Sequence, residues 1–395
     1  MTIKNEKIED VEEIKYIKET EDIKEIEDIK EIFEVFEKLV SIDSPSLHER
    51  KMADYVKTLF AGIGVSLDED MTQSITGSDA GNLFGRVEAE GKAGTTVLFA
   101  AHMDTVNPAL GKKAILHEDG TVTSDGTTVL GADDLSGVTA IYETVKYIKE
   151  NKLPHRPIEI LITVGEELYC KGANAFDYSK VTAKEAYVLD LSGQIGTAAY
   201  AAPTLVSFEA VINGKAAHAG FRPEDGINSI LAAAKAVAVL PQGHIDEVTT
   251  ANIGIISGGS GTNIVSESCR ISGEIRSLNH EKALQVLNQY HETFQKEAGN
   301  VGANLVWDEK LNIQAYETGL DSDVANHYAK AVEKQKLIPV FEKTFGGSDN
   351  NVFAQHGIEG LVIATSMNQV HSCREYANLF EIAQVIRILI DLSKN

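Results

Sequence analysis

Hydrophobic and polar positions form two recurring patterns from about residue 32 onwards. Continuous apolar runs of strand length, such as TTVLFAAHM (95–103), IEILITVG and EAYVLDL, are typical of strands that are buried on both faces. Segments such as SGVTAIYETVKYIKEN have the length and composition of helices and lie between the runs. This alternation predicts the α/β fold class, with a mostly parallel sheet and helices on both of its faces.

A middle region has a different order of elements. Residues 200–312 read as strand, helix, two strands, helix and strand, which predicts a small α+β unit. Alternating helix and strand patterns resume after it. We therefore predict a discontinuous catalytic domain (32–199 and 313–395) with an inserted lid and dimerisation domain (200–312), which is a two-domain architecture.

The first 31 residues follow neither pattern. The hexapeptide EDIKEI occurs at 21–26 and again at 27–32, and apolar residues recur at every third position. Because a helix turns about 100° per residue, such a stripe winds around a helix instead of facing one side. We interpret residues 1–31 as an acidic, repetitive extension without catalytic residues.

Composition and charge narrow the possible partners. A net charge of −23 argues against nucleic acid, because phosphate binding requires clustered Lys and Arg. The sequence has no apolar run of about 18 residues that would span a membrane and no apolar core of a signal peptide at its start. Its three cysteines lie far apart and do not suggest a disulfide framework, so we expect a cytoplasmic protein.

Ionisable residues gather where the predicted strands end. His102 and Asp104 are two residues apart at the end of a strand, so they emerge on the same side. This pair alone would also fit a hydrogen-bonded strand end without a ligand. Two further strands end in Glu166 and Glu167, in VGEELY, and in Asp190, in VLDLSG. Asp133 and Asp134, in LGADDLSG, lie in a turn that opens a helix, and His371, in NQVHSC, follows shortly after the strand-like GLVIATSM. Carboxylates pooled at the carboxyl edge of a parallel sheet are unfavourable without cations.

The residue types favour particular metals. Imidazole mixed with carboxylates suits Zn²⁺, Co²⁺ or Mn²⁺, whereas oxygen ligands alone would suit Mg²⁺ or Ca²⁺. Two His and three carboxylates fit a site for two divalent ions, with one carboxylate bridging them. One residue of the Glu166–Glu167 pair then remains free, and a free carboxylate beside such a site is a natural general base.

The motifs HxD, GADD, GEE, an Asp after a strand and a late His, in this order, resemble those of the M20 metallopeptidases, and the peptidase T-like branch is the most similar. The resemblance extends from about Ile32 to the C-terminus. It implies two zinc ions with Asp133 bridging, His102 and Asp190 on one ion, and Glu167 and His371 on the other.

The same resemblance implies roles for three neighbouring residues. Glu166 would be the general base. Asp104 would accept a hydrogen bond from the second ring nitrogen of His102 and so fix its tautomer. Asp134 would either take part in the site or only shape its turn.

The resemblance also implies functional residues outside the metal site. His218, in NGKAAHAG, would stabilise the oxyanion across a dimer interface, so a homodimer formed through the lid is expected. Asn263 and Arg276 resemble substrate-binding positions, and Arg suits a bidentate grip on a peptide carboxylate. The glycine-rich FGGSDNN segment would bind substrate through Gly346, Gly347 and Ser348.

These observations predict a di-metal peptidase that hydrolyses short peptides, as an aminopeptidase acting on tripeptides or dipeptides. An N-acyl amino acid amidohydrolase would use the same metals and base on a substrate without a free amine. A catalytically idle metal-binding scaffold is a third interpretation. The presence of Glu166 argues against the scaffold, because pure binding does not require a free base.

Overall fold

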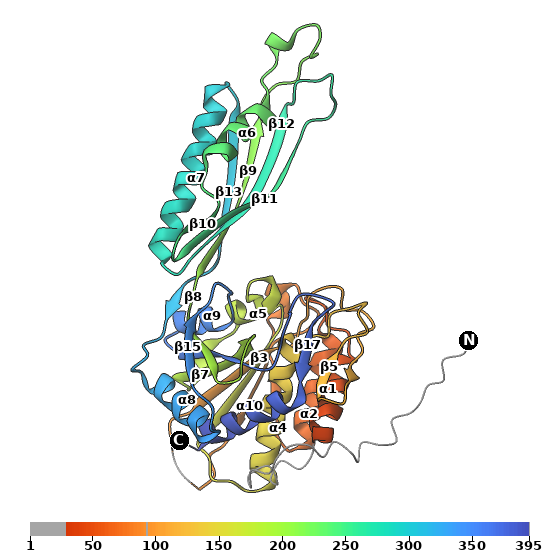
Figure 1. Ribbon diagram of the computed structural model, residues 1–395, viewed down its shortest axis with the longest axis vertical. Helices are drawn as coiled ribbons and strands as arrows, with labels where there is room; N and C mark the ends of the chain where they lie inside the picture. The colour runs from red at the N-terminus through yellow and green to blue at the C-terminus, as the bar shows by residue number, and fades with distance from the viewer. Residues whose placement is uncertain (1–28, 92–93, 395) are drawn as a thin grey trace, which may run out of the picture.

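The computed structural model describes residues 29–91 and 94–394. It has two parts, and the chain passes from the first part to the second and back again (Figure 1). The extension predicted for residues 1–31 lies outside the described residues as far as residue 28. Helix α1 (Ile29–Val40) already begins at Ile29, three residues before the predicted boundary.

The larger part, which we call the catalytic part, is built on a mixed sheet that has nine strands among the described residues. Its strands are β1 (Leu67–Glu69), β2 (Leu83–Val87), β3 (Val97–His102), β6 (Ile158–Thr163), β7 (Glu185–Leu191), β8 (Thr197–Ala202), β14 (Tyr316–Glu317), β15 (Val340–Lys343) and β16 (Glu359–Ala364). The order β1-β2-β6-β3-β7-β16-β8-β14 places β3 near the centre, and β15 pairs with β8. Strands β6, β3, β7 and β16 are mutually parallel, whereas the pairings toward the edges are largely antiparallel.

Helices cover both faces of this sheet, so the expected α/β fold class is confirmed. The helices of the catalytic part are α1, α2 (Arg50–Gly62), α3 (Gln73–Thr76), α4 (Ala132–Glu150), α5 (Lys171–Ala175), α8 (Asp323–Lys334), α9 (Asn350–Gln355) and α10 (Leu379–Ser393). Along β3, Val97, Phe99 and Ala101 pack in one apolar cluster with α1, α2, α4, α8 and α10. Leu98 and Ala100 pack in a second cluster with α5 and α9 on the other face. Burial on both faces explains why the strand reads as a continuous apolar run.

A small sheet lies beside the main one. Its strands are β4 (Ile115–Leu116), β5 (Thr121–Thr123) and β17 (Tyr376–Asn378), paired in the order β17-β5-β4. The pairing of β17 with β5 brings the C-terminal loop that carries His371 close to the segment that precedes α4.

The second part, which we call the lid, comprises residues 204–313. Its strands are β9 (Thr204–Asn213), β10 (Gly243–Asp246), β11 (Thr249–Gly258), β12 (Ser268–Ser277) and β13 (Asn304–Ile313), and its helices are α6 (Ser229–Val239) and α7 (His280–Asn300). The sheet order is β10-β11-β12-β9-β13, with antiparallel pairings throughout. Both helices pack on one face of this sheet, which leaves the other face open (Figure 1). The short strand β10 was absent from the predicted order because four residues carry little periodicity.

The two crossings between the parts are short. Only Pro203 separates β8 from β9, and the return runs from β13 into β14. The side-chain amide of Asn351 donates to the carbonyl oxygens of Pro203 at 3.1 Å and Gln314 at 2.8 Å. One side chain of the catalytic part therefore holds both crossings. None of the described helices is both long and apolar enough to cross a bilayer.

Candidate metal centre

The predicted ligands come together at the carboxyl edge of the central parallel strands. His102 ends β3, Glu166 and Glu167 follow β6, and Asp190 is the second-last residue of β7. Asp133 lies at the start of α4, where its φ of −83° and ψ of 98° are not helical. Parallel strands end at the same edge, and this is where ligands bind in open α/β sheets.

In one group of candidate ligands, His102 and Asp133 are buried and Asp190 is half-buried. His102, Asp133 and Asp190 each offer one ligand atom, and these atoms lie within 4.8 Å of one another. The Nε2 atom of His102 is 3.1 Å from Asp133 Oδ1 and 4.0 Å from Asp190 Oδ1. The other ring nitrogen, Nδ1, is 3.0 Å from the backbone carbonyl oxygen of Asp104. An Nδ1–H that donates to this carbonyl leaves the Nε2 lone pair directed at the carboxylates, as metal ligation requires.

A second group shares Asp133 with the first. The ligand atoms of Asp133, Glu167 and His371 also lie within 4.8 Å of one another. His371 Nε2 is 3.3 Å from Asp133 Oδ2 and 3.0 Å from Glu167 Oε2. The two oxygens of Asp133 thus face the two imidazoles, which is the arrangement expected of a bridging carboxylate.

Asp104 has a wider role than the sequence predicted. Its carboxylate lies 3.4 Å from His102 Nδ1, farther than its own backbone oxygen. It accepts hydrogen bonds from the backbone N–H of Glu166 at 2.9 Å, from that of Glu167 at 3.3 Å and from the Ser46 hydroxyl at 2.7 Å. Asp104 therefore fixes the Glu166–Glu167 loop as well as the histidine.

Glu166 belongs to neither ligand group. Its Oε2 is 4.0 Å from His102 Nε2, and its Oε1 accepts a hydrogen bond from the Cys170 thiol at 3.3 Å. Asp134, which follows Asp133 through a cis peptide bond, accepts from the backbone N–H groups of His102 at 3.2 Å and Gly137 at 3.1 Å. Its contacts are therefore those of a residue that shapes the turn.

The electrostatics of the cluster favour bound cations. Burial raises the pKa values of Glu166, Glu167 and Asp190, and neighbouring carboxylates raise them further. Hydrogen bonds with Asp133 and Glu167 raise the pKa of His371 to about 10. Ionisation of these neighbouring carboxyl groups is thus unfavourable in the absence of a cation, and bound divalent ions would compensate their pooled negative charge. The imidazole and carboxylate donors, in two groups joined by Asp133, fit two such ions.

Two buried carboxylates near the centre were missed in the sequence. Glu375 accepts hydrogen bonds from three backbone N–H groups at the turn before α4, and burial raises its pKa to about 7. Asp349 accepts from the Thr163 hydroxyl at 2.5 Å and shares a buried cluster with Cys170 and Glu166. Glu375 lies four residues after His371, and Asp349 lies inside FGGSDNN, but neither position follows an apolar strand. The strand-end signal therefore did not mark them.

The structure places two predicted residues far from this centre. His218 and Asn263 lie together in the loops at the end of the lid away from the catalytic part (Figure 1), where the Ala219 N–H donates to the Asn263 carbonyl at 2.9 Å. His218 is exposed, and its Nδ1 accepts from the N–H groups of Gly220 at 3.1 Å and Phe221 at 3.2 Å. The proton of the neutral ring therefore sits on Nε2, and this form can donate to an oxyanion.

The remaining predicted residues lie near the crossings. The Arg276 Nη1 donates to the Phe345 carbonyl at 2.9 Å, and its Nε pairs with Glu274 at 2.8 Å. Arg276 thus adjoins the glycine-rich segment, where Gly346 and Gly347 are exposed and Ser348 is buried. A Cβ at Gly347 would lie 2.1 Å from Ile313 Cδ1, so the segment closely approaches the end of the Ile313 side chain in the lid.

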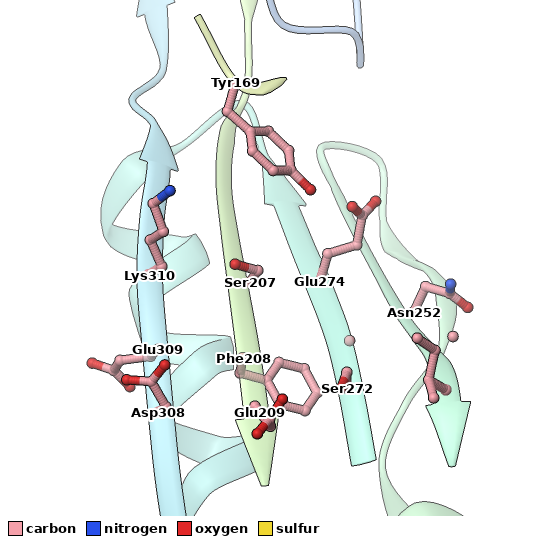
Figure 2. Close-up of a pocket in the computed structure, with 13 residues that line it drawn as sticks. Tyr169, Ser207, Phe208, Glu209, Asn252, Ser272, Glu274, Asp308, Glu309 and Lys310 are labelled. Atoms are coloured by element: carbon pink, nitrogen blue, oxygen red, sulfur yellow. The ribbon is translucent and has the colours of Figure 1, made fainter. Parts of the chain in front are cut away.

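A hollow of about 460 Å³ lies on the open face of the lid sheet, and Tyr169, from the loop after β6, also lines it. Figure 2 shows the ring of Tyr169, two residues after Glu167, pointing toward Ser207 and Glu274 on that face. Lys310 Nζ lies 6.0 Å from the centroid of the same ring. The hollow therefore lies over the lid sheet, and Tyr169 is the lining residue that the catalytic part contributes.

A doubly covered sheet with ligand-type residues at its carboxyl edge and an inserted α+β lid is an arrangement suited to a metal-dependent hydrolase, and comparisons with known proteins show the family. Residues 200–302 match the peptidase dimerisation domain of M20 enzymes, and residues 82–216 match peptidase family M28. An uncharacterised protein, YqjE of Bacillus subtilis, is 39% identical over 353 residues, which cover 89% of this chain and 95% of that protein.

Two solved structures carry the comparison further. The aminopeptidase PepT from Bacillus cereus is 37% identical with a TM-score of 0.87, covering 93% of this chain and 98% of that one. A tripeptidase from Staphylococcus aureus is 30% identical with a TM-score of 0.90 and the same coverage. The chain belongs to the M20 metallopeptidases, in their peptidase T-like branch. The predicted family and the predicted class of enzyme, a metallopeptidase, are therefore confirmed.

Proposed function

We propose that this metallopeptidase uses two zinc ions to remove the N-terminal residue from tripeptides or dipeptides. One observation carries the proposal: two ligand groups share Asp133, and Glu166 lies beside them without belonging to either. The similarity to an aminopeptidase and a tripeptidase supports the substrate class.

We assign the ligands as two sets that meet at Asp133. His102 and Asp190 would hold one ion, and Glu167 and His371 the other. Bound divalent ions would polarise the scissile carbonyl and acidify the attacking water. The inward-facing Nε2 of His102 and the carboxylate pairs suit Zn²⁺, and Co²⁺ or Mn²⁺ would fit the same donors.

Glu166 would move the proton in the reaction. As the water oxygen bonds to the carbonyl carbon, Glu166 takes its proton, and it passes that proton to the leaving nitrogen as the C–N bond breaks. The Cys170 thiol at 3.3 Å and the Asp104 carboxylate, which binds the Glu166 N–H, hold the base toward the ligand groups. Asp104 is therefore assigned to positioning.

A homodimer would complete the site. His218 and Asn263 are exposed at the end of the lid that lies away from the catalytic part of their own chain, so they can serve the site of a partner subunit. The lid offers a surface for pairing, because β10 covers only the start of β11 and leaves its later edge free among the described residues. Apolar side chains surround this edge, and they are Ile255 and Ile256 on β11 with Ile230, Leu231 and Val239 on α6.

The substrate would lie between the metal centre and the lid. Arg276, which donates to the Phe345 carbonyl at the start of the segment that carries Gly346, Gly347 and Ser348, is assigned to the peptide carboxylate, which would displace Glu274 from the guanidinium. The hollow beside Tyr169 gives the peptide room on the open face of the lid.

Three unpaired cysteines, Cys170, Cys269 and Cys373, support a cytoplasmic location.

The deciding experiment compares a tripeptide that has a free amine with its N-acetylated twin. Each is incubated with the protein in added Zn²⁺ or Co²⁺ and again with a chelator. We expect metal-dependent release of the N-terminal residue from the free tripeptide only. Cleavage of the acetylated peptide would instead identify an N-acyl amino acid amidohydrolase, and binding of two metals without cleavage of either would indicate the idle scaffold.

A further inference from the structure

Glu375 binds the turn that carries the shared candidate ligand. Its Oε2 accepts hydrogen bonds from the backbone N–H groups of Leu130 and Gly131, both at 2.8 Å, and its Oε1 accepts from the N–H of Asp133 at 2.9 Å. The side chain is 1% exposed, so the bonds lie away from water. These three hydrogen bonds from one turn of backbone hold that turn in one position.

The same residue closes the loop that carries His371. The backbone of Asn368 and Tyr376 pairs in both directions at 3.0 and 3.1 Å, and the Glu375 N–H donates to the Ser372 carbonyl at 3.1 Å. His371 therefore projects from a closed loop whose base contains Glu375. One carboxylate thus joins two segments that lie more than 200 residues apart in the sequence and that each supply a candidate ligand.

We propose that Glu375 is a positioning residue that sets Asp133 and His371 at the spacing required to hold two cations at once. This inference rests on the proposed function, because it takes Asp133 as the bridging ligand. Asp133 is the second residue of α4, so its N–H has no acceptor within the helix, and it donates to Glu375. The direction of the Asp133 carboxylate, which faces both imidazoles, therefore depends on the Glu375 bond.

A simple structural role is the alternative. The N–H groups at the start of any helix need acceptors, and a buried carboxylate there would stabilise α4 whether or not metals bind. The two roles differ in what they affect. A cap changes the free energy of unfolding alone, whereas a positioning residue also changes the affinity for the second cation and the geometry around it.

The experiment titrates the metal-free protein with Co²⁺ alone. Calorimetry gives the two dissociation constants, and the visible absorption of bound Co²⁺ reports its ligand geometry. We expect Glu375→Gln to bind the first Co²⁺ and to weaken the second by about 10- to 100-fold, with an altered spectrum, as loss of a ligand-orienting partner does. Glu375→Asp, which keeps the charge one methylene farther away, should lie between this variant and the parent.

Glu159→Gln is the matched control. Glu159 is also fully buried and accepts from the backbone N–H groups of Thr182 and Ala183, both at 3.0 Å. It also pairs with Arg86, and it lies on β6 at the edge opposite the metal centre. Its loss should lower the melting temperature and leave both Co²⁺ constants and the spectrum unchanged.

The outcomes separate the hypotheses. Unchanged binding of both ions and an unchanged spectrum in Glu375→Gln, with a lower melting temperature, would reduce Glu375 to a helix cap and overturn the inference. If Glu375→Gln does not fold, the same titration of Glu375→Asp decides the question. A parent protein that binds fewer than two Co²⁺ would contradict the proposed two-ion site itself, which is a different failure.

Discussion

The catalytic part and the lid differ in where they keep their charged side chains. The catalytic part buries many of them, including His102, Asp104, Asp133, Asp134, Arg156, Glu159, Glu166, Asp349 and Glu375. The lid, which is described throughout from 204 to 313, buries no charged side chain, and its buried polar residues are Thr204, Ser229, Thr249, Ser266, Ser277 and Asn312. Its core is apolar and aromatic, with Phe208 and Trp307 stacked at 5.0 Å.

This difference separates two ways of building a site. A buried charge is costly unless a partner compensates it, so each buried charge in the catalytic part indicates a ligand, an ion pair or a set of backbone donors. His218 is exposed, so it carries no such desolvation cost. Its proposed role depends on the partner subunit that would dock against it. Substitutions in the two parts should therefore have effects of different size and kind.

The largest effect is expected at the buried general base. Glu166→Gln keeps the shape of the side chain but cannot accept the proton, so kcat should fall by about 10²- to 10⁴-fold. Its metal content, measured by elemental analysis, should stay at the parent level, because Glu166 lies in neither ligand group. Glu167→Gln is the comparison, and it should lose metal together with activity. Turnover by Glu166→Gln at the parent rate would contradict the proposed mechanism.

Two arginine–glutamate ion pairs, one buried in the catalytic part and one exposed in the lid, test this comparison through the free energy of unfolding. Arg156 and Glu185 form a bidentate pair at 2.8 and 2.9 Å, and the Arg156 side chain is 1% exposed. Arg156→Met removes the bidentate partner of Glu185 and leaves the buried carboxylate only the Tyr187 hydroxyl and His327, so the free energy of unfolding should fall by about 3 kcal/mol. In the lid, the Arg270–Glu209 pair is exposed, and Arg270→Met should cost about 1 kcal/mol or less. Equal losses in urea denaturation would remove the distinction between the parts.

The same distinction explains what the sequence could predict. His102, Glu166, Glu167 and Asp190 follow or end continuous apolar runs, so their convergence followed from the rule that parallel strands end at one edge. The α/β fold class followed from the alternation of those runs with helices. Asp133 and His371 lie outside strands, so only weaker signals indicated them: a turn that opens a helix, a preceding strand-like segment and the order of the motifs.

The remaining residues depend on long-range packing that periodicity does not reveal. Glu375 was missed because its donors, at Leu130, Gly131 and Asp133, are more than 240 residues away in the sequence. The contact of Asn351 with both crossings is likewise non-local. In the lid, the sequence predicted the helices and four strands but could not show that His218 lies away from its own catalytic part.

The position of His218 leads to a prediction about pairs of subunits. His218→Ala should lower kcat by about 10²- to 10³-fold, as loss of an oxyanion donor does. If the imidazole acts in the partner's site, a mixed dimer of His218→Ala and Glu166→Gln subunits contains one intact site. Exchange of equal amounts should give half mixed dimers, and thus about a quarter of the parent activity. Activity that stays at the level of the separate variants would place His218 in its own subunit's site or in none.

The smallest effect is expected from pH acting on the buried pair of the catalytic part. Although burial opposes ionisation, Arg156 holds the pKa of Glu185 below its usual value, with help from the Tyr187 hydroxyl and His327. A carboxylate whose pKa is lower in the folded protein stabilises that protein above its unfolded pKa of about 4.3, and this stability is lost as the pH falls through the folded pKa.

The difference in the free energy of unfolding between the parent and Arg156→Met, the stability gap, should therefore be full at pH 6 to 7 and narrow below about pH 4. It should narrow by about 1.4 kcal/mol for each unit by which Arg156 lowers this pKa. Urea denaturation in the presence of a chelator measures this gap without a contribution from bound metal. Arg270→Met is the control, and its gap from the parent should stay small at every pH because its ion pair is exposed. A gap for Arg156→Met that stays constant from pH 7 to pH 3 would show that the arginine stabilises the catalytic part through packing rather than through its charge.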